Sequence, residues 1–275
     1  MEVGQAIRKR RAVRSSLDTP VAPDVLDRVL SLGLRAPTGS GAQSWAMVVV
    51  QDADVRAKVA QIVQDGASTS FALMRPKADG ASDEEHAAWG REYAQTVLGT
   101  YPQVPVWVLG VVVPRRNYPG PMAQWGRSDD IISVAFPMQN LMLAARAEGL
   151  GTVPTTAFWK FEETRLREAL SLPDEVEPVI LTPLGHPTEF PTGKAPALAR
   201  TFKTWRTLVH DDRYGNVREM DDSTLTCPRE FEWQVIVDYP FDERGHGPDE
   251  DLRPCLLYTS PNTRDRTRSR MPSSA

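Results

Sequence analysis

The chain has 275 residues, of which 41% are hydrophobic and 25% charged, so it can bury a substantial core as one domain with an extension. A formal net charge of −4 argues against broad nucleic-acid binding, which requires a basic surface. No apolar run approaches the roughly 20 residues that cross a bilayer, and no secretory signal follows Met1, so we expect a cytoplasmic protein that does not enter a membrane. Cys227 and Cys255 have no partner at metal-ligand spacing, and we expect no metal site.

A basic cluster opens this otherwise acidic chain. It consists of Arg8, Lys9, Arg10, Arg11 and Arg14. Such a cluster is either a solvated helix face or a binding site for an anion, and the residues alone leave both interpretations open.

The next segment predicts a helix, a loop and a strand. Apolar residues recur at helical spacing over 23–34, and small residues then fill 36–41. Residues 45–50 predict a strand that ends in β-branched residues. A small-residue loop between a helix and a strand is a candidate ligand cradle.

The central part of the chain is less regular. Residues 68–100 have helical stretches but weak periodicity, and are a candidate lid or excursion over a pocket. A strongly apolar strand is predicted over 104–113, and a loop over 114–127.

A long helix is predicted over 129–148, with Ser128 or Asp129 as its N-cap. It is apolar on nearly all sides, so it packs either inside a core or against a second subunit. Pro137 lies within it and removes a backbone donor. The helix is expected to stop at Gly149-Leu150-Gly151, where glycine supplies the left-handed C-terminal cap.

The remaining elements indicate the fold class. A short strand-like segment is predicted over 152–158, a helix over 161–170 and a strand over 176–184. Helices and strands do not alternate regularly enough for a doubly wound parallel sheet. We therefore predict an α+β fold with a mostly antiparallel sheet flanked by helices.

Three segments together resemble the nitroreductase family. They are Arg10 to Arg14 (RRAVR), Ala36 to Trp45 (APTGSGAQSW) and Gln139 to Thr152 (QNLMLAARAEGLGT). Two supporting segments lie at 183–187 and 209–215, and the resemblance extends over residues 1–215. It implies an α+β homodimer with FMN bound in two pockets at the subunit interface. It also implies that hydride passes from NAD(P)H to a small electron-poor acceptor such as a nitroaromatic or a quinone.

The resemblance also indicates which residues bind the cofactor. Because guanidinium groups bind phosphate through directed, charge-assisted bonds, Arg10 and Arg14 are expected at the FMN phosphate, with Arg11 and Ala12 in the same motif. The remaining expected cofactor contacts are Gln43, Leu150, Gly151 and Thr152, with Arg200 or Lys203 as a late basic residue. No side chain is expected to act as a catalytic acid or nucleophile, because the chemistry belongs to the flavin.

Plainer interpretations of these positions stay open. Gln43 can instead cap its own loop, and the glycines of 149–151 can serve only to end the helix. Two residues also depart from the family: Gly41 replaces the usual Asn, and Ser44 the usual Pro. These changes leave two alternatives to the leading function. One is a specialised flavin reaction such as dehalogenation, flavin cleavage or dehydrogenation, and the other is a flavin-binding interaction module without catalysis.

The residues beyond 215 fall outside the resemblance. Residues 216–254 are an unassigned extension or a truncated segment, with a strand predicted over 231–239. Cys255 to Ser260 (CLLYTS) corresponds to a translation of the end sequence used in transposon-based library preparation. We therefore expect 255–275 to be a disordered, non-native tail produced by a sequencing artefact, the alternative being a genuine basic tail.

Overall fold

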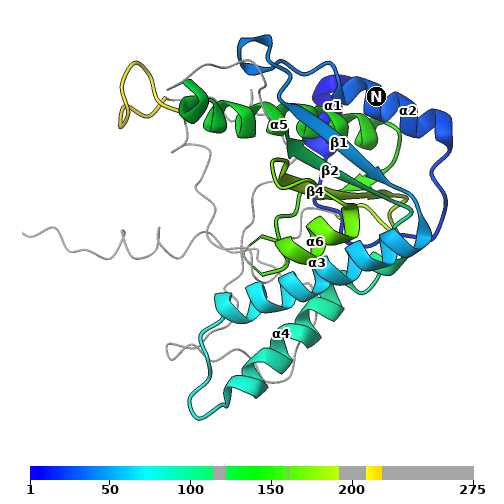
Figure 1. Ribbon diagram of the computed structural model, residues 1–275, viewed down its shortest axis with the longest axis vertical. Helices are drawn as coiled ribbons and strands as arrows, with labels where there is room; N and C mark the ends of the chain where they lie inside the picture. Colours follow the sequence, from blue (N-terminus) through cyan, green and yellow to red (C-terminus); the bar gives the residue numbers. More distant parts are fainter. Residues whose placement is uncertain (114–121, 160, 192–208, 219–275) are drawn as a thin grey trace, which may run out of the picture. The chain divides into compact units, whose positions relative to one another are not determined.

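The computed structural model describes residues 1–113, 122–159, 161–191 and 209–218. The chain divides into two compact units, Met1–Leu73 with Ala81–Phe190, and Met74–Gly80 with Pro191–Ala275. The first unit contains the sheet and its helices (Figure 1). In the second, described residues 209–218 form a turn in which His210 pairs with Val217. Among the described residues, no helix combines the length and apolarity needed to cross a membrane.

The first unit is built on a four-stranded sheet with the order β1-β2-β4-β3. The strands are β1 (Trp45–Val50), β2 (Val106–Val112), β3 (Gly151–Thr152) and β4 (Glu177–Gly185). All three pairings are antiparallel, which confirms the predicted α+β class. The strand-like segment expected over 152–158 is wrong in extent, because only its first residue belongs to β3 and only Thr155 forms a further bridge.

The helices have the following bounds: α1 Val3–Lys9, α2 Pro23–Gly33, α3 Ala53–Met74, α4 Asp83–Leu98, α5 Met122–Ala147 and α6 Glu163–Leu170. Two short 3-10 turns lie at Gly39–Gly41 and Tyr101–Gln103. The predicted helix over 23–34 is confirmed as α2, and the end of α3 together with α4 accounts for the helical stretches of 68–100.

The sheet is covered on both faces, and this explains why β2 is buried along its whole length. One core contains Val106, Val108 and Val112 of β2 and residues of α2 and α5. The other contains Trp107 and Leu109 of β2 together with residues of α3, α4 and α6. Figure 1 shows the same layering, with α2 and α5 on one side of the strands and α3 and α6 on the other.

Helix α5 begins earlier than predicted. It starts at Met122, so the loop expected up to residue 127 is wrong for residues 122–127, and Ser128 and Asp129 lie inside the helix and do not cap it. Pro137 is within the helix as expected, and Gly149 ends it with a φ of +80°.

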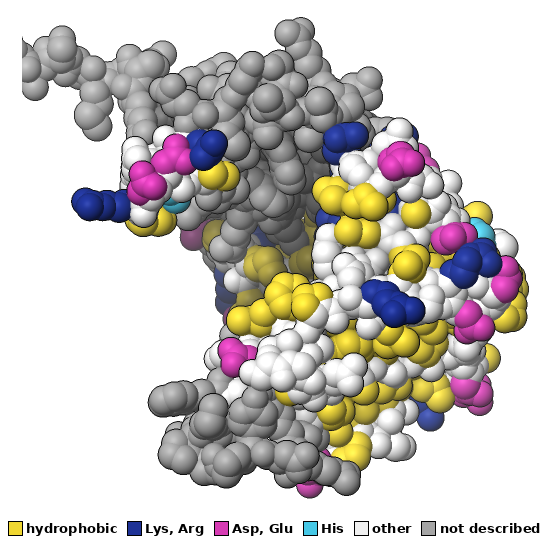
Figure 2. All heavy atoms as spheres, turned by 90° about the horizontal axis from the view of Figure 1, so that it is seen from above, with side chains coloured by type: hydrophobic (Ala, Val, Ile, Leu, Met, Phe, Trp, Pro, Cys, Tyr) yellow, Lys and Arg dark blue, Asp and Glu magenta, His cyan; other side chains and the backbone are white. Residues whose placement is uncertain are grey.

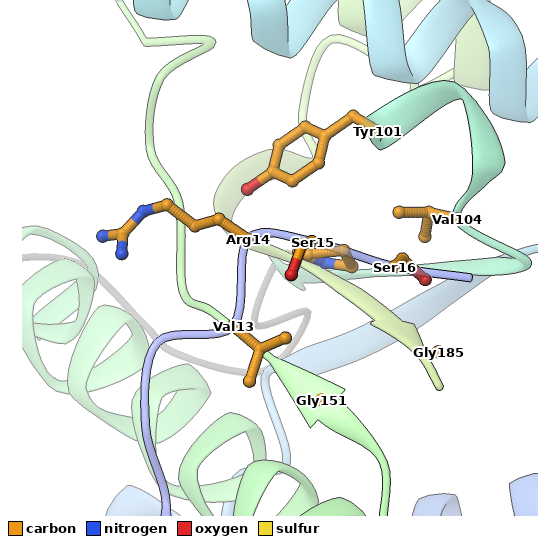
Figure 3. Close-up of a pocket in the computed structure, with 9 residues that line it drawn as sticks. Val13, Arg14, Ser15, Ser16, Tyr101, Val104, Gly151 and Gly185 are labelled. Atoms are coloured by element: carbon orange, nitrogen blue, oxygen red, sulfur yellow. The ribbon is translucent and has the colours of Figure 1, made fainter. Parts of the chain in front are cut away.

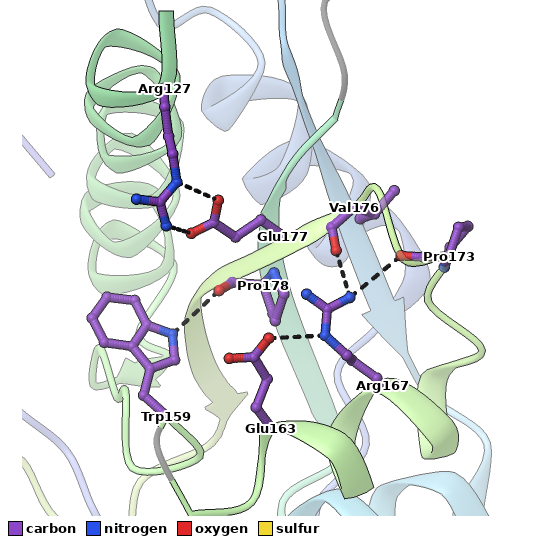
Figure 4. A network of polar contacts seen from close by, with 8 residues as sticks. All are labelled: Arg127, Trp159, Glu163, Arg167, Pro173, Val176, Glu177 and Pro178. Carbon is purple, nitrogen blue, oxygen red and sulfur yellow. Dashed lines mark hydrogen bonds and ion pairs between the residues drawn. The ribbon is translucent and has the colours of Figure 1, made fainter. Parts of the chain in front are cut away.

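Ion pairs and backbone bonds attach α6 and α5 to the start of β4 (Figure 4). Arg167 of α6 donates to the Glu163 carboxylate at 2.8 Å and to the carbonyl of Val176 at 2.8 Å. Arg127 of α5 donates to both carboxylate oxygens of Glu177, at 3.1 and 2.6 Å. These contacts fix the start of β4, whose other end, at Gly185, pairs with Gly151 of β3.

Candidate functional site

The N-terminal segment after α1 lies along the end of the sheet and brings two of the three sequence motifs together. Ala12 forms a parallel bridge with Thr152, and the Val13 N–H donates to the Thr152 carbonyl at 3.0 Å. Further along, the Leu17 N–H donates to the His186 carbonyl at 2.8 Å. The arginine motif and the glycine turn therefore form one local structure, although about 140 residues separate them in sequence.

Glycine is required where these segments meet. A Cβ atom on Gly151 would lie 2.6 Å from Val13 Cγ1, well inside van der Waals contact. A Cβ atom on Gly185 would lie 2.7 Å from both Pro105 Cδ and Ser16 Oγ. The close approach of these segments thus depends on the missing side chains.

The segment also lines a small pocket (Figure 3). Its walls include Val13, Arg14, Tyr101, Gly151 and Gly185. In Figure 3 the Tyr101 hydroxyl points toward Arg14, whose side chain extends away from Val13 and Gly151. Burial raises the pKa of Tyr101, and the charge of Arg14 acts in the opposite direction.

A threonine outside all three motifs holds this segment in place. Thr100 Oγ1 accepts the Ser16 N–H at 3.0 Å and donates to the Arg14 carbonyl at 3.4 Å. Ser15 and Thr188 share a hydroxyl hydrogen bond of 2.6 Å. Sequence reasoning missed Thr100 and Tyr101, because they follow a helix and carry no local pattern that indicates a site.

The arginines of the basic cluster have different roles. Arg11 donates to the carbonyls of Arg8 at 2.6 Å and Arg10 at 2.8 Å, so it covers carbonyls at the C-terminal end of α1. Arg146, which the sequence analysis did not single out, donates to the Lys9 carbonyl at 3.0 Å and caps the same helix. Cationic groups at a helix C-terminus are also favoured by the helix dipole. Arg11 of the basic cluster and Arg146 of α5 therefore serve the local fold.

Neither Arg10 nor Arg14 forms an ion pair with any described residue. Arg10 Nη1 is buried without a hydrogen-bond partner, and desolvation lowers the pKa of this guanidinium. A buried, unpaired guanidinium is costly unless an anion or acceptor meets it. The pair therefore has the character of an anion site.

The second motif forms a separate loop beside the N-terminal half of α5. The Gly39 N–H donates to Ser133 Oγ at 3.0 Å, and the buried Ser44 hydroxyl donates to Asp130. Gln43 is exposed and has a φ of +45°, a value that residues other than glycine rarely adopt.

The sheet register places this loop far from the arginine motif and the glycine turn of the same chain. Trp45, directly after the loop, pairs with Val112, whereas Leu184, beside the glycine turn, pairs with Val106. Six residue steps along β2 separate these pairs, which corresponds to roughly 20 Å at the rise of a strand. A single chain thus brings the backbone of the arginine motif to the glycine turn, but not Gln43.

Two expected site residues, Arg200 and Lys203, lie outside the described residues. Within the described part of the chain, no group of three or more His, Cys, Asp or Glu side chains could hold a metal ion.

Comparison with known proteins identifies relatives of both the sequence and the fold. The family model described as the nitroreductase family matches residues 7–186, and a model described as the PglY fourth domain matches residues 197–273. Iodotyrosine deiodinase 1 of Rattus norvegicus is 26% identical over 192 residues, which are 68% of this chain and 62% of the relative. The chain thus spans less than two thirds of that relative's length.

Two further relatives are matched over a larger share of their own length. Nitrobenzene nitroreductase of Ectopseudomonas oleovorans is 24% identical over 228 residues, 76% of this chain and 97% of the relative. The solved NADPH:FMN oxidoreductase of Vibrio harveyi, complexed with NAD⁺, has a TM-score of 0.53 and 17% identity, with 81% of each chain covered, which shows a shared fold. The family model matches about two thirds of the sequence, from α1 to the end of β4. The chain therefore belongs to the nitroreductase family.

Proposed function

We propose that this protein is an FMN-dependent oxidoreductase that transfers hydride from NAD(P)H to a small electron-poor acceptor. The observation that carries the proposal is the pair Arg10 and Arg14, without carboxylate partners among the described residues, held against the Leu150–Thr152 turn by the Ala12–Thr152 bridge.

The residues present fit the phosphate of FMN. Arg10 offers a buried Nη1 with no protein acceptor, and Arg14 reaches out beside the pocket. Charge-assisted bonds to a phosphate contribute about 1.5–3 kcal/mol each, which would offset the cost of desolvating Arg10. Arg11 is assigned a smaller part, because two of its bonds already go to backbone carbonyls.

The proposal places the flavin ring beside the Leu150–Thr152 turn. Gly151 lets the arginine segment lie directly against this turn, because a Cβ atom there would overlap Val13. When bound, FMN would supply the hydride-accepting ring, and the chain's contribution is to orient that ring and to exclude water. The proposal therefore assigns no general acid or nucleophile to the protein.

A second copy of the chain would complete each site. Trp45, two residues after Gln43, and Leu184, next to the glycine turn, lie roughly 20 Å apart along β2, so the proposal does not place Gln43 and Gly151 of one chain at the same flavin. Ile132 and Phe136 are 53% and 44% exposed on α5, next to Ser133, which holds the Gln43 loop. Figure 2 shows that hydrophobic side chains gather on the face of the molecule seen from above. We propose a homodimer in which this face meets its copy and Gln43 reaches the partner's flavin.

The first test is the absorbance spectrum of the purified protein and an FMN titration. We expect a yellow protein that retains FMN, and we expect Arg14→Ala to weaken FMN binding by at least about tenfold, the equivalent of one charge-assisted bond. A matched control is Arg91→Ala, which removes an exposed arginine on α4 paired only with surface groups such as Glu84. A colourless protein that does not take up FMN would contradict the proposal.

The shared site has a test of its own. Arg14→Ala and Gln43→Ala proteins are each expected to bind FMN weakly at both sites. When the two are unfolded together and refolded as mixed dimers, one site per mixed dimer regains both residues. Recovery of tight FMN binding in about half of the mixed-dimer sites supports the shared site, and no recovery refutes it.

A second candidate function is reductive dehalogenation, which the 26% identity to iodotyrosine deiodinase 1 favours. In that reaction two electrons and a proton replace a carbon–halogen bond by a carbon–hydrogen bond and release halide. The two candidates are separated by supplying NADPH or NADH with either nitrobenzene or iodotyrosine, and measuring cofactor oxidation and iodide release. A protein that binds FMN but performs neither reaction would support the non-catalytic alternative.

A further inference from the structure

The loop before β1 has an unusual backbone. Ser40, Gly41 and Gln43 have φ values of +53°, +65° and +45°. Only glycine adopts this region freely, and Ser40 and Gln43 carry side chains. Such conformations persist only where the surrounding structure enforces them, and they gather at functional sites.

Two buried polar residues provide that enforcement. Ser44 is 2% exposed and donates its hydroxyl to Asp130 of α5, which is 6% exposed. The Ser44 carbonyl in turn accepts the Val113 N–H at 3.0 Å, at the end of β2. Ser44 is therefore fixed from both sides, and it directly follows Gln43.

The other end of the loop is tied in the same way. The Gly39 N–H donates to Ser133 Oγ at 3.0 Å, one helical turn from Asp130. The Gln43 N–H donates to Thr38 Oγ1 at 3.2 Å, which closes the loop on itself. Two residues of α5, Asp130 and Ser133, thus hold the loop at its two ends, and Gln43 is exposed on the surface of the loop.

The serine also permits the conformation of Gln43. A residue that precedes proline is confined to extended backbone, so a proline at position 44 would conflict with the left-handed φ of Gln43. Serine removes this restriction and adds the bond to Asp130.

We infer that Ser44 and Asp130 are positioning residues that hold Gln43 in its left-handed conformation for contact with the flavin. The inference rests on the proposed FMN function. According to this inference, the buried Ser44–Asp130 pair does not contact the flavin itself but fixes the conformation in which Gln43 does.

The test compares FMN binding by fluorescence titration and the midpoint potential of the bound flavin. Ser44→Ala is expected to weaken FMN binding by about tenfold, the change expected when one net hydrogen bond is lost, and to shift the potential. Ser44→Thr keeps the hydroxyl and is expected to restore both. The matched control is Ser31→Ala, which removes an exposed hydroxyl bonded only to its own helix, and which is expected to change neither.

A double-mutant cycle separates positioning from general destabilisation. In a Gln43→Ala background, Ser44→Ala is expected to cause no further loss of affinity and no further shift in potential. Additive losses, or a Ser44→Ala protein that binds FMN like the wild type, would overturn the inference. If Ser44→Ala does not fold, Thr38→Val, which removes the hydroxyl that accepts the Gln43 N–H, carries the same expectations.

The two proposals fail in different ways. If the wild-type protein does not bind FMN, the proposed function fails and this inference fails with it. If the wild type binds FMN and Arg14→Ala weakens binding, while Ser44→Ala and Thr38→Val do not, only the positioning role is wrong.

Discussion

Replacing Gly151 by alanine tests the contact that joins the arginine segment to the sheet. The added Cβ would lie 2.6 Å from Val13 Cγ1 and 2.9 Å from Val13 Cβ, whereas carbon atoms pack at about 3.5–4.0 Å. Val13 must move by roughly 1 Å to relieve the overlap, and its N–H bond to Thr152, now 3.0 Å, would then be lost. Overpacking costs about 1–3 kcal/mol and the lost bond about 1 kcal/mol, so we expect Gly151→Ala to lower the free energy of unfolding by about 2–4 kcal/mol.

The assay is urea-induced unfolding of single and double variants. Val13→Ala removes two buried methyl groups, at a cost of about 1.6 kcal/mol, but it also makes room for the new methyl group. Gly151→Ala should therefore cost at least about 1 kcal/mol less in the Val13→Ala background than in the wild type. Gly149→Ala is the matched control, because its Cβ would meet nothing within 4 Å and its φ of +80° alone accounts for a cost of about 1–2 kcal/mol. The reasoning would be refuted if Gly151→Ala cost no more than Gly149→Ala, or if its cost did not depend on Val13.

Three further predictions concern stability. Gly66→Ala on α3 would place a Cβ 2.0 Å from the Ala157 carbonyl oxygen, so we expect a loss of at least about 3 kcal/mol by urea unfolding, whereas Gly4→Ala, whose nearest neighbour is 3.5 Å away, should be tolerated. Arg167→Met removes the donors to Val176 and Glu163 (Figure 4), and we expect the free energy of unfolding to fall by about 1–3 kcal/mol. The control Arg91→Met, at an exposed arginine, should lower it by at most about 1 kcal/mol. Equal losses would contradict the role assigned to Arg167. Burial raises the pKa of Tyr101 above its value in the unfolded chain. The buried, neutral Tyr101 side chain therefore contributes its full stabilisation of the fold below about pH 10, and this stabilisation declines as the pH rises further. Stability measured against pH should therefore fall less steeply above about pH 10 in Tyr101→Phe than in the wild type.

Local patterns in the sequence determined several elements of this fold. The strand over 45–50 has its predicted bounds, and the helix from Pro23 ends within one residue of the prediction. Gly149 ends α5 as its sequence position indicates, because a left-handed cap depends mainly on the glycine itself. The family resemblance was expected over residues 1–215, and the family model matches residues 7–186 of that range.

Elements that depend on their neighbours were predicted less well. Helix α3 begins at Ala53 but has weak periodicity, because it packs against both the sheet and α4 and is buried on more than one side. The start of α5 at Met122 was missed since the residues before Asp129 have the composition of a loop. In both cases tertiary packing outweighs local preference.

The sequence by itself identified the arginines, the glycine turn and the Gln43 loop as candidate binding residues. Only the tertiary structure decided which of them meet, because strand register joins Ala12 to Thr152 and places Gln43 at the other end of β2. It also separated Arg11, whose guanidinium binds backbone carbonyls, from Arg10, whose buried Nη1 has no partner. Contacts of this kind join residues far apart in the chain, and their geometry is fixed by the packing of the whole sheet rather than by any local pattern.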